Sequence, residues 1–137
     1  MTSIISITEA SSIALHSMVL IANTDKNLNV IKISELTGSS KHHVAKILQR
    51  LVKDNYLNSN RGPYGGFTLK KKPKEISLLD IYESIEGRID VADCPVENPE
   101  CPFTRCILEN ITKKMTIEFK EFLASKTLDL YLTDMIK

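Results

Sequence analysis

The first amphipathic segment of the chain has apolar residues three and four positions apart, at Ala10, Ile13, Ala14, Met18, Ile21 and Ala22. Just before it, Ser6-x-x-Glu9 has the pattern of a capping box, in which a serine hydroxyl and a glutamate carboxylate satisfy free N–H groups at a helix start. We therefore predict a helix over residues 7–23, followed by an exposed polar loop over residues 23–29.

The next apolar positions predict two elements joined by a glycine turn. Val30–Ile33 is short and β-branched, and Ser34 can cap a brief helix that Gly38 ends. A longer helix then begins near Lys41 and ends near Asp54, with one apolar stripe formed by Val44, Ile47, Leu48, Leu51 and Val52. Two helices joined by a tight turn predict a helix-turn-helix, whose second helix carries its polar and basic residues on the other faces.

Strand patterns follow the helix-turn-helix. Two short candidate strands, Tyr56–Asn60 and Phe67–Leu69, flank a loop that contains three glycines and a proline. A basic hairpin placed directly after a helix-turn-helix predicts a wing. Beyond the hairpin, the Ser77-x-x-Asp80 pattern predicts a capped helix that Gly87 closes.

The last third of the chain predicts a loop and then a long helix. Residues 88–106 have little periodicity, three prolines and all the cysteines. A long amphipathic helix is expected from Ile107, Ile111, Met115, Phe119, Phe122 and Leu123, and a short one restarts at Thr127 with Leu128, Leu130, Leu132 and Ile136. The long helix lies far along the chain from the wing, so we expect its stripe to pack on a second subunit, or partly on the first helix of its own chain.

Charge is distributed unevenly along a chain whose net charge is only +1. Residues 32–74 carry ten basic and two acidic side chains, a net of +8, whereas residues 75–137 have a net of −6. A lysine-rich solvated surface would explain the charge alone. Because the basic charge coincides with the helix-turn-helix and the hairpin, it instead indicates a surface that binds DNA.

The length of 137 residues suits a single core. The fold class that we predict is mainly α, a winged helix-turn-helix with a two-stranded wing and a long C-terminal dimerisation helix. Residues 1–87 would form the DNA-binding domain, 88–106 a cysteine-bearing loop and 107–137 the dimerisation helices. The longest apolar stretch is shorter than the ~20 residues of a membrane span, and the first residues lack a secretory signal, so we expect no membrane segment and a cytoplasmic protein.

The three cysteines are the candidate chemistry of the chain. Cys94, Cys101 and Cys106 have the spacing C-x6-C-x4-C, and their odd number and close spacing argue against a disulfide framework. Their thiolates could bind an iron-sulfur cluster, or a zinc ion with a nitrogen as fourth ligand, or could form a disulfide on oxidation. On the residues alone, zinc is favoured.

One motif resembles a known family. Arg61-Gly-Pro-Tyr-Gly-Gly-Phe-x-Leu69, followed by Ile76-Ser-Leu-Leu-Asp-Ile81 and by Ile85-Glu-Gly87, is similar to the Rrf-type family of bacterial winged-helix transcription regulators. That family includes the iron-sulfur cluster regulator and the nitric-oxide-sensing repressor. The resemblance implies a homodimer that binds a double-stranded DNA operator, with the recognition helix in the major groove and Arg61 of the wing in the minor groove.

The resemblance also implies which residues contact DNA. Arg61 occupies the wing position of the family, and a narrow, A/T-rich minor groove attracts a guanidinium. The expected DNA-binding residues are Ser40, Lys41, His42, His43, Lys46, Arg50, Arg61, Gly62, Pro63 and Tyr64. The recognition helix departs from better-known members, since Ala45 stands where some have a base-contacting glutamate, and His42 and His43 could instead be plain surface histidines.

With the resemblance, an iron-sulfur cluster on Cys94, Cys101 and Cys106 is favoured over zinc. The family's familiar fourth ligands are absent, because Glu109 replaces the histidine of one member and Ser12 the aspartate of another. Some relatives use a histidine within an Ala-Leu-His run of the first helix, which corresponds to His16; a buried or interfacial histidine is the alternative for that residue. A histidine ligand favours a 2Fe-2S over a 4Fe-4S cluster.

Three functions remain to be compared. The first is a DNA-binding regulator, expected to be a repressor, whose operator affinity depends on an iron-sulfur cluster that senses redox state, nitric oxide or cluster supply. The second is a cluster-free winged-helix regulator that responds to thiol oxidation, zinc or a small molecule. A cysteine-based oxidoreductase is the third, and it lacks the Cys-x-x-Cys pair and the βαβ frame it would need, so we do not expect an enzyme.

Overall fold

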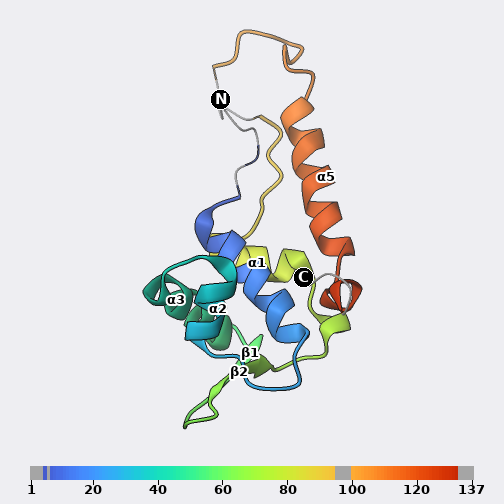
Figure 1. The fold of residues 1–137 in the computed structure, drawn as a ribbon. Coiled ribbons are helices and arrows are strands. Elements are labelled where there is room, and N and C mark those ends of the chain that lie inside the picture. Colours follow the sequence, from blue (N-terminus) through green and yellow to red (C-terminus); the bar gives the residue numbers. More distant parts are fainter. Residues whose placement is uncertain (1–4, 6, 95–99, 133–137) are drawn as a thin grey trace.

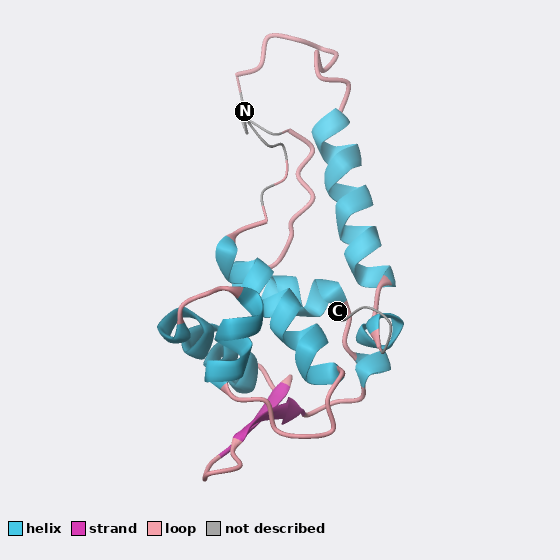
Figure 2. Cartoon of the chain, viewed as in Figure 1, coloured by secondary structure: helices cyan, strands magenta, loops and turns pink. Residues whose placement is uncertain are grey.

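The computed structural model describes residues 5, 7–94 and 100–132, which form a winged module with a long helix beside it (Figure 1). The element order is α1 (Glu9–Ala22), α2 (Val30–Thr37), α3 (Lys41–Lys53), β1 (Leu57–Asn60), β2 (Gly66–Leu69), the 3-10 turn η1 (Pro73–Glu75), α4 (Leu78–Glu86), α5 (Ile111–Ser125) and the 3-10 turn η2 (Leu128–Tyr131). Helices dominate, and the two strands form one antiparallel hairpin (Figure 2). The predicted fold class is confirmed.

Helix α1 begins later than predicted. Its N-cap is Thr8, whose Oγ1 accepts a hydrogen bond from the backbone N–H of Ser11 at 3.0 Å. The predicted capping box includes Ser6, which lies outside the described residues; Glu9, its expected partner, is the first helical residue and not the third. Ile13, Ala14, Met18 and Ile21 are buried, as the helical spacing predicted.

Helix α2 begins at Val30, so the interpretation of Val30–Ile33 as a β-branched segment before the helix was wrong. Asn29 caps the helix by accepting a hydrogen bond from the N–H of Lys32 at 2.8 Å. The cap and the complete burial of Ile33 outweigh the weak helix propensity of the β-branched residues. The predicted end is confirmed, with Gly38 in the left-handed conformation at φ 70°.

The elements from α3 to α4 follow the predictions closely. Ser40 caps α3 through the N–H of His43 at 3.2 Å, and Val44, Ile47, Leu48 and Leu51 are buried. In the hairpin, Leu57 pairs with Leu69 and Asn60 with Gly66. The predicted capping box of α4 is present, with both Ser77–Asp80 hydrogen bonds at 3.0 Å.

Helix α5 begins at Ile111, four residues after the predicted start at Ile107. Glu109 and Asn110 have positive φ angles of 50° and 60°, which an α-helix cannot accommodate, and Ile107 is 74% exposed. Part of the apolar stripe packs within the chain, but on α4 rather than on α1. There the rings of Tyr82 and Phe119 meet edge to face with centroids 5.6 Å apart.

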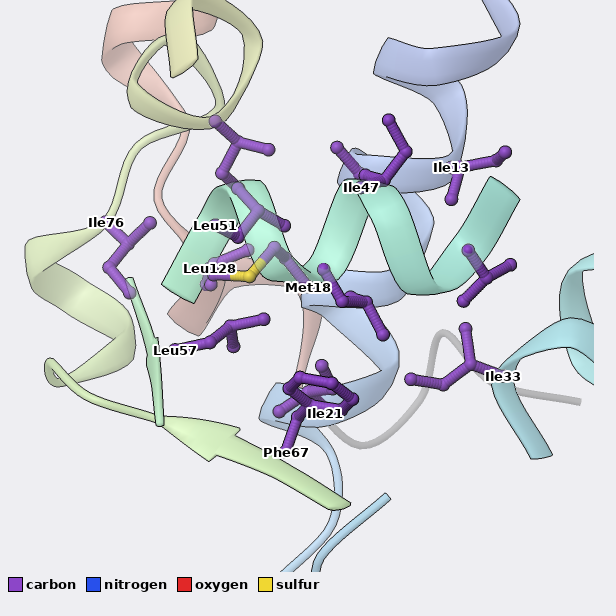
Figure 3. Close-up of a cluster of buried hydrophobic side chains, with 14 residues drawn as sticks. Ile13, Met18, Ile21, Ile33, Ile47, Leu51, Leu57, Phe67, Ile76 and Leu128 are labelled. Carbon is purple, nitrogen blue, oxygen red and sulfur yellow. The ribbon is translucent and has the colours of Figure 1, made fainter. Parts of the chain in front are cut away.

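The buried core joins the winged module to the end of the chain (Figure 3). Leu128 is fully buried among core residues from α1, α3 and the wing, and its N–H donates to the carbonyl of Ile76 at 3.0 Å. The N–H of Leu78 donates to the carbonyl of Lys126 at 2.8 Å. Residues beyond α5 therefore return to the winged module and fix the base of α5 against α4.

Candidate nucleic-acid interface and cysteine loop

Helix α3, the predicted recognition helix, presents a polar face opposite its buried stripe. Ser40, Lys41, His42 and Lys46 are exposed, and Ser40 and Lys41 stand at the helix start, where N–H groups attract an anion. His43 is turned toward α1, with its Nδ1 3.5 Å from Glu9 Oε1. The structure thus brings four of the expected DNA-binding residues to one accessible face and holds His43 beside an acidic partner.

Arg50 lies near the other end of α3 and bonds to α4. Its Nε donates to the carbonyl of Ser84 at 3.1 Å and to Asp54 Oδ2 at 3.3 Å. Ser84 is buried, and its hydroxyl donates to the same Asp54 oxygen at 2.5 Å. The Arg50 side chain remains 54% exposed, so it ties the recognition helix to α4 while part of the guanidinium stays open to solvent.

The wing carries its expected residues at an exposed tip. Arg61, Gly62, Pro63 and Tyr64 are all exposed, and Tyr64 retains 90% of its accessible surface. The turn closes through a hydrogen bond from the N–H of Gly65 to the carbonyl of Gly62 at 2.9 Å. Gly62 has φ 107°, a conformation that a side chain would strain. This turn directs the backbone around Arg61 away from the core.

Sequence reasoning missed a contact between the wing and the α1–α2 loop. Residues 23–29 were expected to be only an exposed loop, but Asn27 hydrogen-bonds both Asn60 and Tyr64. Leu28 also pairs with Phe67 as an isolated antiparallel bridge. The pairing joins residues more than thirty positions apart, so no local pattern could have signalled it.

The first part of the cysteine loop, residues 88–94, is bonded to both α4 and α5. The carboxylate of Glu83 accepts a hydrogen bond from the N–H of Ile89 at 2.7 Å, and Lys120 Nζ donates to the Ile89 carbonyl at 3.1 Å. One step further, Lys113 Nζ lies 2.5 Å from Asp93 Oδ1. Lys113 holds the pKa of Asp93 below its usual value through a hydrogen bond and through its charge. These contacts place Cys94 beside α5.

The three thiols are all free and lie in the loop that precedes α5. Cys94 and Cys106 are half-buried and Cys101 is exposed. Hydrogen bonds from the backbone N–H groups of Asn110 and Leu108 lower the pKa of the Cys106 thiol, because they stabilise the thiolate. Thiolates are the form in which cysteine binds metal, so this donor fits a metal site, although no three His, Cys, Asp or Glu side chains of the described residues are gathered around one point.

The two candidate fourth ligands lie on different elements. His16 is exposed on α1, and its Nδ1 lies 2.7 Å from the carbonyl of Ser12. Because a carbonyl only accepts, Nδ1 carries the proton and Nε2 of the neutral ring remains a lone-pair donor. His16 also lines a groove of about 810 Å³ between α1, α2 and η2. Glu109, by contrast, pairs with Arg105 at 3.1 Å.

A comparison with protein families shows which family the chain belongs to. The model of the Rrf2 family, described as an iron-dependent transcriptional regulator, matches residues 7–134. The chain belongs to this family. The resemblance expected from the wing motif is therefore confirmed.

Curated Rrf2 relatives are transcription regulators and not enzymes, as expected from the sequence. The chain is 30% identical to the HTH-type transcriptional repressor NsrR of Streptomyces coelicolor over 70% of this chain and 66% of that protein. It is 26% identical to the HTH-type transcriptional regulator IscR of Pectobacterium atrosepticum over 90% and 71% of the two chains. For BadM of Rhodopseudomonas palustris, 37% identical, the match spans 43% of the relative's length.

Solved structures of Rrf2 regulators share the fold. CymR, the global cysteine regulator of B. subtilis, superposes with a TM-score of 0.76 at 24% identity over 91% of this chain and 94% of that one. IscR of T. potens gives a TM-score of 0.73 at 21% identity over 91% and 84%. Within the described part of the chain, no helix is long and apolar enough to cross a membrane.

Proposed function

We propose that this Rrf2 chain is a transcriptional repressor that binds a two-half-site DNA operator as a homodimer, and that an iron-sulfur cluster on its cysteine loop controls operator affinity. The observation that carries the proposal is that the first part of the cysteine loop is bonded to both α4 and α5. The elements that hold Cys94 are α4 and α5, and α4 is in turn bonded to the recognition helix through Arg50. A change at the loop can therefore reach the DNA-binding face through packed elements.

The DNA-binding face combines the helix start and the wing. In this proposal the recognition helix enters the major groove with Ser40, Lys41, His42, His43 and Lys46, and Arg50 contacts the backbone at its edge. Arg61 enters the minor groove, where Gly62 and Pro63 allow the backbone to approach and Tyr64 lies against the sugar-phosphate edge. All of these residues except His43 are exposed, which supports these roles, and His43 and Arg50 are also bonded within the chain.

The cluster would be held by Cys94, Cys101 and Cys106. The lowered pKa of Cys106 suits a thiolate ligand, and the family description as iron-dependent favours iron over zinc. His16 is the proposed fourth ligand because its Nε2 keeps a lone pair at an exposed position, with Glu109 as the alternative. A histidine ligand favours a 2Fe-2S centre, and the bound cluster would supply reactivity toward oxidants and nitric oxide.

A second copy of the chain would complete the site. Apolar residues cluster around the start of α5, where Ile107 is 74%, Leu108 45% and Ile111 47% exposed. Contiguous exposed apolar surface of this kind indicates an interface. In the proposed dimer the His16 of one protomer lies over the cysteine loop of its partner, so the two halves share each cluster.

The test is anaerobic purification followed by a spectrum, iron and sulfide analysis and a binding assay. The DNA is a duplex that the protein itself selects from a random library. We expect visible absorbance, iron and sulfide in equal amounts, and operator affinity that changes when the cluster is removed. His16→Ala should lose or blue-shift the absorbance while Glu109→Ala should not. Colourless, zinc-containing protein would contradict the cluster.

The second candidate is a cluster-free regulator that responds to thiol oxidation. The lowered pKa of the Cys106 thiol favours it, since the thiolate is the form that oxidants attack. In this case colourless protein would still bind the selected duplex, and hydrogen peroxide would change the affinity. The Cys106→Ser variant would not respond.

A further inference from the structure

The loop between α1 and α2 adds a third backbone segment to the wing. The N–H of Phe67 donates to the carbonyl of Leu28 at 2.9 Å, and the N–H of Leu28 donates to the carbonyl of Phe67 at 3.2 Å. In Figure 1 this loop passes beside the hairpin on its way from α1 to α2. The base of the wing is therefore fixed on both edges of β2.

Gly66 shows how closely the two backbones approach. A Cβ built at this residue would lie 2.7 Å from the carbonyl oxygen of Leu28, which is closer than real Cβ contacts come. Its φ of 150° also favours glycine. The absence of a side chain at this position is what allows the α1–α2 loop to reach the hairpin.

Asn27 extends this contact to the tip of the wing. Its Nδ2 donates to the carbonyl of Tyr64 at 2.8 Å, and its Oδ1 accepts from Asn60 Nδ2 at 2.8 Å. Asn60 is the last residue of β1 and directly precedes Arg61. One amide thus joins the two sides of the turn that presents Arg61.

We propose that Asn27 is a positioning residue that holds the wing in its DNA-binding conformation. The proposal rests on the minor-groove role of Arg61 given above. Arg61, Gly62 and Pro63 are exposed, so nothing buried restrains the tip itself. A tip fixed before binding loses less conformational freedom when Arg61 enters the groove, and the affinity rises accordingly.

The test uses two alanine variants and one control. Asn27→Ala removes both hydrogen bonds and Asn60→Ala removes one, whereas Asn58→Ala changes an exposed asparagine of the same hairpin whose long hydrogen bond, 3.5 Å to the carbonyl of Leu69, lies away from the tip. Asn27→Ala should weaken binding of the protein-selected duplex about 5-fold and Asn60→Ala by about half that factor. Asn58→Ala should leave the affinity unchanged.

A double-mutant cycle separates positioning from a general loss of folding. In the Arg61→Ala background, Asn27→Ala should have no further effect, because the side chain that it positions is gone. In addition, amide hydrogen exchange of residues 61–65 in the free protein should become faster in Asn27→Ala, with exchange in α3 unchanged.

Three results would overturn the inference. Equal affinity and equal exchange in Asn27→Ala and the parent would show that the tip is not held by this amide. Additive losses in the cycle would mean that Asn27 acts apart from Arg61. If Arg61→Ala does not change the affinity while the parent binds DNA, the result contradicts the minor-groove role of Arg61 and with it the inference. If the parent selects no duplex, but hydrogen exchange is still faster in Asn27→Ala than in the parent, the result would instead count against the proposed function alone.

Discussion

The winged module and the cysteine loop are stabilised in opposite ways. The module shares one buried core, in which Leu48, Leu51 and Ile81 are inaccessible to solvent. In the described parts of the loop, 88–94 and 100–110, no residue is buried. Charged and polar contacts from Lys113, Lys120 and Glu83 hold it instead. Burial fixes the part proposed to bind DNA, and surface contacts hold the part proposed to bind the cluster.

This difference suits a sensor. Regions with few buried apolar contacts open at low free-energy cost, whereas core elements open only with the whole domain. A ligand or metal at the loop can therefore rearrange it without unfolding α3 or the wing. The connection to α3 runs through α4, whose Ser84 is bonded to both Asp54 and Arg50.

The largest expected effect tests the contrast in stability. Leu48→Ala should lower the free energy of unfolding by about 2–5 kcal/mol, because it leaves a cavity in the core. Phe103→Ala, in the loop and 56% exposed, should change it by no more than about 0.5 kcal/mol. Urea unfolding of the metal-free protein gives both values. Similar losses for the two variants would show that the loop is part of the core.

The next effect concerns the proposed dimer. Ile111→Asp should weaken self-association about 10-fold or more, because a charge would be buried without a partner in an apolar interface. Lys114→Asp places the same charge at an exposed position of α5 and is the control. Sedimentation equilibrium measures both. A dimer constant that Ile111→Asp leaves unchanged would mean that this surface is open to solvent in the assembly.

A smaller effect distinguishes two of the basic residues of α3, Arg50 and Lys46. Arg50→Ala should cost roughly 1 kcal/mol of folding stability, because the carbonyl of Ser84 and the Asp54 carboxylate each lose the hydrogen bond from Nε, while Asp54 keeps the one from the Ser84 hydroxyl. Lys46→Ala should leave stability unchanged and reduce the salt dependence of DNA binding, by about 0.9 in the log–log slope for each phosphate that is no longer neutralised. Thermal unfolding and salt titrations measure the two. If Arg50→Ala leaves stability intact, the hydrogen bonds from α3 to α4 do not stabilise the fold.

Local signals explain which parts of the fold the sequence could predict. Gly38, Ser40 and the Ser77–Asp80 pair are caps that act on adjacent residues, so the end of α2 and the bounds of α3 and α4 were predicted nearly as observed. The start of α2 was missed because the Asn29 cap and the burial of Ile33, a tertiary effect, together override the preference of β-branched residues. The start of α5 was missed because its apolar periodicity continues through two residues with left-handed backbones.

The candidate site shows the same division. Cys94, Cys101 and Cys106 are evident from their spacing, and Arg61 from its glycine-rich turn. The contacts that position them, Lys113 with Asp93 and Asn27 with Tyr64, join residues twenty and thirty-seven positions apart. Such pairs have no signature in one sequence, since many exposed lysines and asparagines look alike. The fourth ligand is harder still, because the proposed donor comes from a second chain.

The smallest expected effect tests whether the loop is held by its surface contacts. Asp93 and Lys113 form an ion pair, and the pKa of Asp93 lies below its ordinary value of 3.8. A lowered folded-state pKa contributes stability that is present above pH 3.8 and is lost as the pH falls through the folded-state pKa. Lys113→Ala should raise the pKa of Asp93 back toward 3.8, and carboxyl carbon shifts across a pH titration measure it.

The pair is exposed, with 87% of the Asp93 side chain accessible, so salt should weaken it and its effect on global stability should be slight. Its local effect should be visible in hydrogen exchange, which should become faster for residues 89–94 in Lys113→Ala and not in the control Lys114→Ala, whose lysine is exposed on the same helix. Unchanged exchange in Lys113→Ala would mean that Cys94 is restrained instead by Lys120 and Glu83, which bond to the backbone of Ile89. Lys120→Ala would then be the variant that releases the loop, and with it the path from the cysteines to α4.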